Sequence, residues 1–468
     1  MENFKERIKY CKVPAPNNIP ATEPVDLTHE TLQLHKEKVL ARMKESKMDV
    51  LLVYGDREHG TNFGYLTGFE PRFEEALLAM HSTGKAYLLL GNESLRMQQY
   101  SRIEVEAIHT PHFSLPNQPM ETTMTITELI QSAGIEQGMK VGIAGWKMFT
   151  SAIEDNELLF DTPQFIVESV KKIVGDTGQV WNATSIFIHP SNGARILMNA
   201  NEIAHYEFGA SLASSRIQKM LDQLEPGKTE MELADGLAAY GQPNNVQTIC
   251  ATGERFTNAV VAPREKKVEI GDKFSATLGY RGGLTSRSAY VVSSAEELAP
   301  DVADYMDVIA RPYFAACVAW YENIRIGMTG GEMYNMIESV IPKSIFGWKL
   351  NPGHLTAGEE WMSSPIYPKS DIVISSGMIF QVDIIPSVAG YGGASAEDGV
   401  AIADKALREE LAESYPEVWE RMQARREYMI NTLGIQLNPE VLPMSTLNGY
   451  FRPYLLNKEF AFKAINRG

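Results

Sequence analysis

Hydrophobic positions in the first half of the chain alternate between helical spacing and short continuous runs. A helix over residues 32–47 is predicted by apolar residues at helical intervals, namely Leu34, Val39, Leu40 and Met43. Short apolar runs bounded by polar residues or glycine follow at 50–54, 76–80, 86–90 and 141–145. Short apolar runs between helical stretches predict a buried sheet flanked by helices. We therefore expect an α/β domain over residues 31–190.

The second half contains an internal repeat. A long helix is predicted over 201–224, and the sequence Gly-Lys-Thr-Glu-Met-Glu-Leu follows it from Gly227. A second long helix is predicted over 301–323, and the similar sequence Gly-Met-Thr-Gly-Gly-Glu-Met follows it from Gly327. Both copies carry Thr-x-x-Glu, the capping box, in which the two side chains satisfy the N–H groups at a helix start. Capping boxes are common enough to coincide by chance. The matching order of elements nevertheless favours a duplicated helix–turn–helix unit within a domain over 195–440.

The two ends of the chain have a different composition. Residues 1–30 hold four prolines and few large apolar residues, which predicts an extended arm. Residues 441–468 include an aromatic segment at 448–454, and we expect this tail to pack on the second domain.

Charge and cysteine usage narrow the class of protein. The net charge of -16 and the pI of about 5.2 argue against nucleic acid as a partner. No apolar stretch reaches the length of a membrane helix, and the charged start lacks the apolar region of a secretory signal. Cys11, Cys250 and Cys317 lie far apart, so we expect small buried hydrophobic residues rather than disulfides or a zinc site. These features predict a cytoplasmic protein without a membrane partner.

Motifs in the last third of the chain carry a resemblance to a known family. Gly353-His354 is followed by Gly358 and Pro365, and residues 376–383 resemble a strand written Gly-Met-x-x-x-x-Glu. Residues 396–402 resemble Arg-x-Glu-Asp-x-x-x-Val, and residues 64–69 contain Tyr-Leu-Thr-Gly-Phe. The chain thus resembles the creatinase / prolidase / aminopeptidase P family. The resemblance implies an α/β N-terminal domain plus an α+β pita-bread C-terminal domain, and commonly a homodimer.

The same resemblance implies five ligands for two divalent ions: two Asp, one His and two Glu. The matching positions here are Thr277, Ser288, His354, Asp383 and Glu397. Two further family histidines are missing: Val260 stands at one position, and the loop before Pro365 supplies no histidine for the other. Neutral hydroxyls are poor ligands for divalent ions, and only two carboxylates remain. We therefore expect neither a dinuclear metal centre nor another cofactor.

The remaining polar positions define a candidate site. We expect His354, Asp383 and Glu397 to transfer protons, and Thr277, Ser288, Val260 and Arg287 to line the substrate pocket. Glu397 and Asp398 are adjacent on a strand and should face opposite sides, with Glu397 in the site. Each candidate has a simpler alternative. His354 could be a surface loop residue, Asp383 an exposed strand residue, and Arg287 an ordinary strand-end arginine instead of a counter-charge.

Three functions remain open from the sequence. The first is a metal-independent hydrolase or lyase acting on a small C–N-bonded compound. The second is a non-catalytic relative that binds a small molecule or a short peptide in the same cleft. The third is an Xaa-Pro aminopeptidase or dipeptidase with an atypical metal site. The retained His354, Asp383 and Glu397 favour a ligand in the cleft, whereas the missing aspartates and histidines weaken the third hypothesis.

Overall fold

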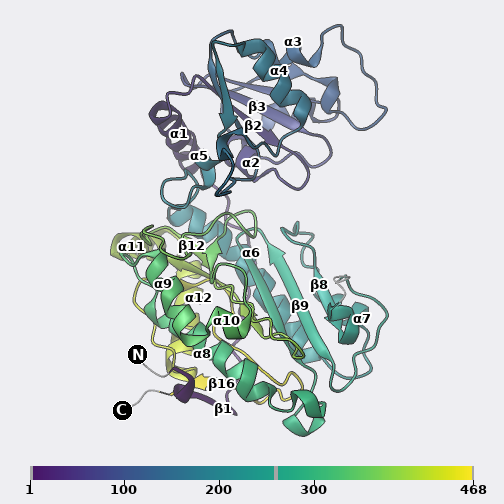
Figure 1. Ribbon diagram of the computed structural model, residues 1–468, viewed down its shortest axis with the longest axis vertical. Coiled ribbons are helices and arrows are strands. Elements are labelled where there is room, and N and C mark those ends of the chain that lie inside the picture. The colour runs from purple at the N-terminus through teal and green to yellow at the C-terminus, as the bar shows by residue number, and fades with distance from the viewer. Residues whose placement is uncertain (1–3, 258–261, 466–468) are drawn as a thin grey trace. The chain divides into compact units, whose positions relative to one another are not determined.

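The computed structural model describes residues 4–257 and 262–465, and the chain divides into two compact units (Figure 1). The first unit comprises residues 27–196. The second combines residues 1–26 with residues 197–468. A mixed sheet with helices in the first unit and antiparallel sheets with helices in the second confirm the predicted fold class, an α/β N-terminal domain and an α+β C-terminal domain.

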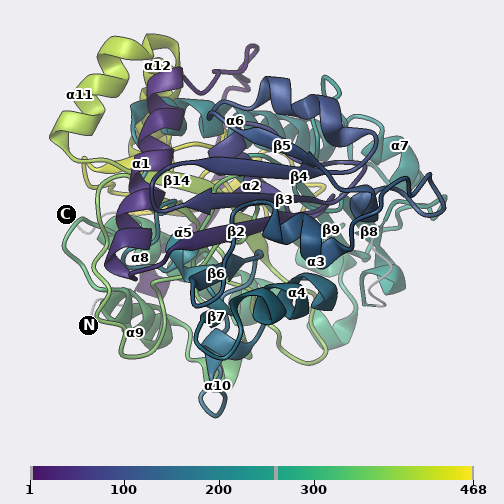
Figure 2. The ribbon, with the colours of Figure 1, turned by 90° about the horizontal axis from the view of Figure 1, so that it is seen from above.

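A six-stranded mixed sheet forms the centre of the first unit. Its strands lie in the order β5-β4-β3-β2-β6-β7, and Figure 2 shows β2 to β5 in this sequence. All four predicted apolar runs are strands of this sheet. The strands are β2 (Val50–Gly55), β3 (Ala76–His81), β4 (Ala86–Leu90), β5 (Glu106–His109), β6 (Lys140–Ala144) and β7 (Gln179–Asn182). Every residue of β2 is buried, as expected for a central strand covered on both faces.

Helices and short 3-10 turns surround this sheet. The first helix begins at His29 rather than at residue 32, because the Thr28 side chain accepts a hydrogen bond from the Thr31 backbone N–H and caps the helix start. The helices are α1 (His29–Glu45), α2 (Thr61–Thr67), α3 (Ile126–Gln131), α4 (Gln164–Val174) and α5 (Ser185–Ile188). The 3-10 turns are η2 (Ser94–Tyr100), η3 (Pro111–Phe113) and η4 (Asn156–Leu158).

Two four-stranded antiparallel sheets form the centre of the second unit, in the orders β13-β10-β9-β8 and β11-β12-β14-β15. Their strands are β8 (Ile249–Thr252), β9 (Lys273–Tyr280), β10 (Gly283–Tyr290), β11 (His354–Leu355), β12 (Ile379–Gln381), β13 (Ser395–Glu397), β14 (Gly399–Ile402) and β15 (Val441–Pro443). Only Asp398 separates β13 from β14, so one extended segment joins the two sheets. The polar side chains of both sheets are thereby brought to a common region.

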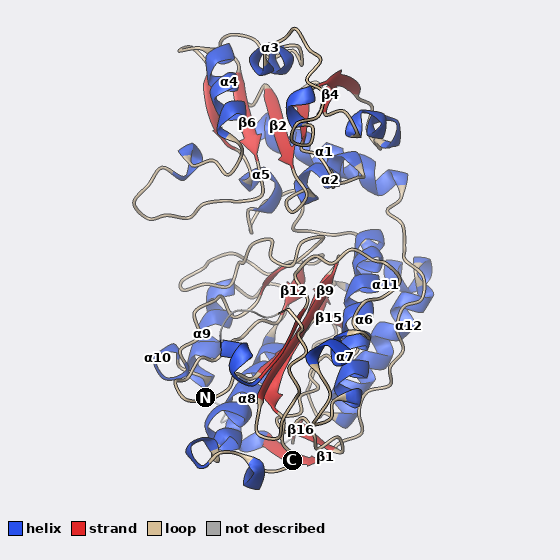
Figure 3. Ribbon diagram, turned by 90° about the vertical axis from the view of Figure 1, so that its right-hand side faces the viewer, coloured by secondary structure: helices blue, strands red, loops and turns tan. Residues whose placement is uncertain are grey.

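Helices pack against these sheets, and Figure 3 shows α6 beside β9 and α12 beside β15. The α-helices are α6 (Ala200–Gln223), α7 (Glu230–Ala234), α8 (Arg311–Asn323), α9 (Gly330–Val340), α10 (Lys343–Phe346), α11 (Lys405–Ser414) and α12 (Pro416–Glu427). The shorter helical turns are η1 (Phe4–Arg7), η5 (Gly253–Thr257), η6 (Ala295–Glu297), η7 (Pro300–Val302), η8 (Met306–Ala310) and η9 (Tyr428–Thr432). The predicted helix over 301–323 is therefore a π-helical turn, η8, continued by α8.

The duplicated unit predicted from the sequence is present. Both capping boxes form, with Thr229 and Thr329 each bonded reciprocally to the glutamate three residues later. Gly227 and Gly327 have φ angles of 92° and 86°, and their N–H groups bond to the carbonyl oxygens of Val268 and Ile374. The two residues that follow Gly227 also pair through their backbones with the segment that contains Val268. The two residues that follow Gly327 pair in the same way with the segment that contains Ile374. The two halves thus repeat a turn, a cap and a strand contact.

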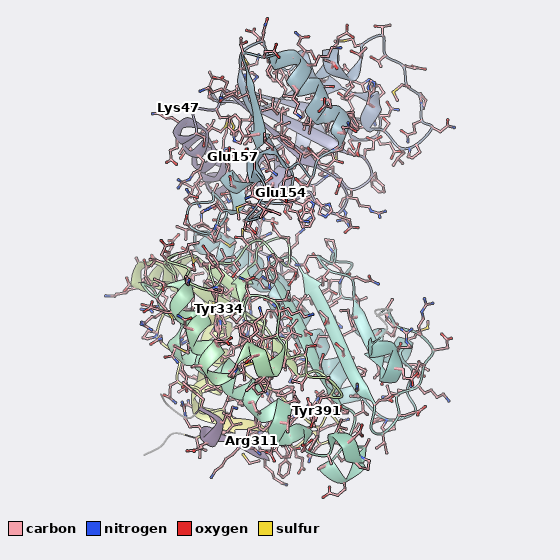
Figure 4. All side chains as sticks on the ribbon, viewed as in Figure 1. Lys47, Glu154, Glu157, Arg311, Tyr334 and Tyr391 are labelled. Carbon is pink, nitrogen blue, oxygen red and sulfur yellow. The ribbon has the colours of Figure 1, made fainter. Side chains whose placement is uncertain are left out.

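Both ends of the chain form strands in the second unit. The predicted arm contains β1 (Ile8–Lys12), which pairs antiparallel with β16 (Phe460–Ala464). Arg311, labelled in Figure 4, holds β1 by donating a hydrogen bond of 2.6 Å to the carbonyl oxygen of Ile8. The predicted tail does more than pack on the domain, because its first residues form β15 and pair with β14.

Cys250 and Cys317 are buried and free, as predicted, whereas free Cys11 is half-buried in β1. Across the described part of the chain, no helix combines the length and apolar character that a bilayer crossing needs.

Candidate functional site

Strand pairing places a row of polar side chains on one face of the β13-β10-β9 sheet. Thr277 lies opposite Ser286, and Ser286 lies opposite Glu397. Residues directly opposite each other in an antiparallel pair share a face. The Thr277 hydroxyl donates to the Ser286 hydroxyl at 2.8 Å, and the Ser288 hydroxyl donates to the Ser275 hydroxyl at 2.9 Å. Glu397 therefore stands at one side of a face lined by mutually bonded hydroxyl groups.

The second sheet supplies the histidine and the aspartate. His354 on β11 lies opposite Gln381 on β12, and Asp383 follows two residues later. His354 and Gln381 are 0% exposed and Asp383 is 4% exposed. His354 Nε2, Gln381 Oε1 and Asp383 Oδ1 have no hydrogen-bond partner among the described residues. Burying such groups without partners is costly, which is typical of a site that receives a ligand.

These residues converge with a glutamate that was not among the predicted site residues. His354 Nε2 lies 3.3 Å from Glu360 Oε1 and 3.9 Å from Asp383 Oδ2. Single donor atoms of His354, Glu360 and Glu397 all lie within 4.8 Å of one another. We call His354, Glu360, Asp383 and Glu397 the His354 cluster. The structure therefore brings the three predicted catalytic residues together and adds a third carboxylate.

The loop between β11 and β12 also orients the histidine. Trp361 stacks on the His354 imidazole with ring centroids 4.0 Å apart and an interplanar angle of 21°. His354 Nδ1 lies 3.2 Å from the carbonyl oxygen of Leu355. On the other side of the ring, Nε2 faces Glu360 and Asp383.

Glu360 was not predicted, because the family resemblance places a histidine and no glutamate in this loop. The signal was the acidic pair Glu359-Glu360 directly after Gly358, near His354 in the sequence. A second missed residue is Gln381, which precedes Asp383 by two positions and so occupies the same face of the strand.

Burial and carboxylate repulsion shift the proton equilibria of the cluster. Burial raises the pKa of Asp383 from 3.8 to about 6, against the opposing effect of His354 and with a contribution from Glu360. Burial also raises the pKa of Glu397 well above its ordinary value, and the charges of Asp383 and Glu360 act in the same direction. Carboxyl groups this close resist ionising together. Both Glu397 and Asp383 therefore hold a proton more tightly than an isolated carboxyl group does.

Replacing Asp383 by asparagine is expected to stabilise the protein at pH 7 by about 1–3 kcal/mol. The folded-state pKa of Asp383 is raised, so between pH 3.8 and about 6 the folded state binds more protons than the unfolded state. Stability contributed by protonated Asp383 is present at low pH and is lost as pH rises through this window. The asparagine variant does not lose this stability as pH rises, because its side chain does not ionise.

Urea unfolding of both proteins at pH 4 and pH 7 tests this prediction. The difference in unfolding free energy should appear at pH 7 and shrink toward pH 4, whereas the exposed control Asp371→Asn should show no such trend. A lower stability of the Asp383 variant at pH 7 would mean that a bound cation neutralises this carboxylate in the native protein.

Arg287 was predicted to line the pocket, and this prediction is wrong. Arg287 Nη2 lies 2.6 Å from Asp398 Oδ2, and both side chains are almost fully buried. Its Nη1 also donates to the carbonyl oxygens of Ser286 and Glu397. Because Arg287 neighbours Ser286 and Ser288 in β10, it faces the side of the sheet opposite the cluster. Arg287 compensates Asp398, which also accepts from Thr285.

The remaining predicted residues indicate whether the site could hold two metal ions. Val260 lies outside the described residues. Thr277 and Ser288, at the positions of two family aspartates, carry no charge and bond to neighbouring hydroxyls. These residues do not fit a dinuclear metal centre, because two of its carboxylates are absent. His354, Glu360 and Glu397 have the donor types and the proximity to hold at most a single cation.

Comparisons with known proteins agree with this architecture. Residues 205–404 match the model of Metallopeptidase family M24. The chain is 22% identical over 356 residues to the "Uncharacterized peptidase YqhT" of Bacillus subtilis (strain 168), covering 74% of this chain and 90% of that protein. The resemblance to the creatinase / prolidase / aminopeptidase P family is thus confirmed.

Solved structures show the same fold. The prolidase from Pyrococcus horikoshii OT3 matches with a TM-score of 0.60 and 18% identity, over 79% of this chain and 95% of that one. The Xaa-Pro dipeptidase from Bacillus anthracis matches with a TM-score of 0.59 and 16% identity, over 80% and 96%. At these identities the likeness establishes the pita-bread fold and leaves the activity to be argued from the site.

Proposed function

We propose that this protein hydrolyses a C–N bond in a small compound or short peptide that carries a positively charged nitrogen, without a dinuclear metal centre. The observation that carries the proposal is the His354 cluster, in which three carboxylates surround one imidazole. His354 is completely buried, and Asp383 and Glu397 are less than 10% exposed. Strongly perturbed carboxyl groups that converge in this way are typical of a catalytic site.

The charge of the cluster favours a cationic substrate. No lysine or arginine of the described chain lies within ion-pair distance of Glu360, Asp383 or Glu397. Buried carboxylates are costly without a positive partner. Oxygen atoms of Gln381 and Asp383 are unpartnered acceptors, which an ammonium or guanidinium group would satisfy with its N–H donors. The Trp361 ring provides an aromatic surface of the kind that attracts such cations.

The proton inventory of the cluster fits hydrolysis. Ionised Asp383 accepts a proton from water as the water oxygen bonds to the substrate carbon. Protonated Glu397 donates its proton to the leaving nitrogen as the C–N bond breaks. The proton on Asp383 then returns to Glu397, so one water is consumed per bond. His354, held by Trp361 and the Leu355 carbonyl, positions Asp383 and Glu360 around the reacting atoms.

An activity screen tests this function. Metal-free protein would be incubated with guanidino compounds, amides of small diamines and Xaa-Pro dipeptides, the last because relatives are called prolidase and Xaa-Pro dipeptidase. Release of an amine, ammonia or urea is expected from a cationic member of the panel. Saturable binding of such a compound without any turnover would instead favour the non-catalytic alternative.

Removal of metal is expected to leave thermal stability unchanged. Ligands that bind only the native state raise its stability, so a protein without a native metal loses nothing to a chelator. The melting temperature before and after dialysis against EDTA should agree, and metal analysis of purified protein should find well below one equivalent. Two equivalents of manganese, zinc or cobalt, together with a lower melting temperature after chelation, would restore the atypical metallopeptidase hypothesis.

Assembly as a homodimer and a cytoplasmic location stay predictions from the sequence, and sedimentation velocity would test the first. The proposed ligand class, a small molecule or a short peptide, leaves no role for nucleic acid, in agreement with the acidic balance of the chain.

A further inference from the structure

A cavity of about 240 Å³ lies in the second unit, away from the residues of the His354 cluster. One wall is the chain segment of residues 14–19, and the other is the end of α12 with the following turn η9. The lining residues are Pro14, Ala15, Pro16, Asn17, Ile19, Arg421, Ala424, Arg425, Tyr428, Thr432 and Thr446. All of these residues are described, and all belong to the same compact unit.

Two arginines at this cavity share a single carboxylate. Glu207, which is 0% exposed, lies 2.6 Å from Arg421 Nη2 and 2.7 Å from Arg425 Nη1. Burial lowers the pKa of Arg425, and the neighbouring Arg421 adds to this effect, as expected for two cations held close together. Glu417 also acts on Arg421, but its side chain is exposed to solvent and therefore screened. The buried part of the site retains one excess positive charge.

Hydrogen-bond donors remain unused at the same cavity. The bonds of Arg421 to Glu207 engage Nε and Nη2, which leaves Nη1 without a partner among the described residues. Arg425 donates through Nη1 and Nη2 to Pro443 and Ser211 and has Nε available. Thr446 is 4% exposed, and its Oγ1 has no partner either. Unused donors beside an excess positive charge are the complement of an oxyanion.

We propose that this cavity binds a small organic anion, with a carboxylate against Arg421, Arg425 and Thr446. The opposite surfaces are apolar, formed by Pro14, Pro16 and Ile19, so they suit the hydrocarbon part of such a molecule rather than a free inorganic ion. The cavity shares no lining residue with the His354 cluster. The proposal therefore stands independently of the proposed hydrolase function.

Isothermal titration calorimetry on the full chain tests the proposal with benzoate, succinate, inorganic phosphate and butylammonium chloride. A carboxylate should bind with millimolar or tighter affinity, and butylammonium should not bind at this site. Thr446→Val removes one hydroxyl with almost no change in volume and should weaken carboxylate binding about tenfold. The same substitution at exposed Thr177, in the first unit, should change the affinity less than twofold.

A second variant keeps the test decisive if the threonine substitution disturbs folding. Ala424→Leu adds a side chain at the cavity wall, on an exposed part of α12, and should abolish carboxylate binding while leaving the melting temperature nearly unchanged. Carboxylate affinity that survives Ala424→Leu would overturn the site. Phosphate binding as tightly as benzoate would overturn the assignment to an organic anion, and no heat of binding up to about 10 mM of any anion would overturn both.

Discussion

Replacing Arg287 by alanine is expected to lower the unfolding free energy of the second unit by about 3–5 kcal/mol. The substitution removes the guanidinium that lies 2.6 Å from Asp398, whose side chain is 0% exposed. Burial already raises the pKa of Asp398, and Arg287 is the main influence that lowers it. Without Arg287 the carboxylate must either stay ionised and uncompensated or take up a proton. The Leu447 carbonyl oxygen also loses a donor.

Urea unfolding followed by tryptophan fluorescence measures this effect. Arg325→Ala, at an exposed arginine of the same unit, should cost no more than about 0.5 kcal/mol. The double variant Arg287→Met with Asp398→Asn should recover much of the lost stability, because no buried charge then remains unpaired. A loss below about 1 kcal/mol for Arg287→Ala would show that Asp398 finds another partner and that the pair does not stabilise the β13-β10-β9 sheet.

Replacing Glu397 by glutamine is expected to reduce kcat/KM for C–N hydrolysis by about 10²–10⁴-fold. Glutamine preserves the shape of the side chain but cannot donate and regain the proton that the leaving nitrogen requires. Binding of a cationic substrate analogue should change much less, because protonated Glu397 contributes little charge to the site. The measurement compares steady-state kinetics and analogue affinity of the two proteins, with the substrate found in the activity screen.

Two further results decide the role of Glu397. Glu413→Gln, at an exposed glutamate of α11, should keep full activity and serves as the matched control. Unchanged kcat with a raised KM for Glu397→Gln would assign Glu397 to substrate binding rather than to proton transfer.

The sequence by itself determined the local elements of this protein. The apolar runs that became β2, β3, β4 and β6 needed no tertiary information, because a continuous run of apolar residues has to be buried on both faces. The capping boxes at Thr229 and Thr329 are interactions within four residues, so their spacing predicted them and the repeat that they mark. The loss of two metal-ligand carboxylates is also a property of residue identity, visible at Thr277 and Ser288.

Part of the site could have been predicted more accurately from the same rules. Arg287 and Ser288 are adjacent on a strand, so strand alternation forbids both from facing one pocket. The same alternation separates Glu397 from Asp398. The assignment of Arg287 to the substrate pocket was therefore avoidable.

Only the tertiary structure decided which charges meet. Glu360 lies in a loop without periodicity, and no local rule indicates that its carboxylate comes within 3.3 Å of His354. Strand alternation separates Arg287 from Ser288 but cannot say that Asp398 faces the arginine, because the pairing of β10 with β13 joins segments more than 100 residues apart. The side chains of α6 and α12 that meet around Glu207 are also more than 100 residues apart in the sequence. Electrostatic energy depends on distances in space, and these distances exist only once the sheets and helices have packed.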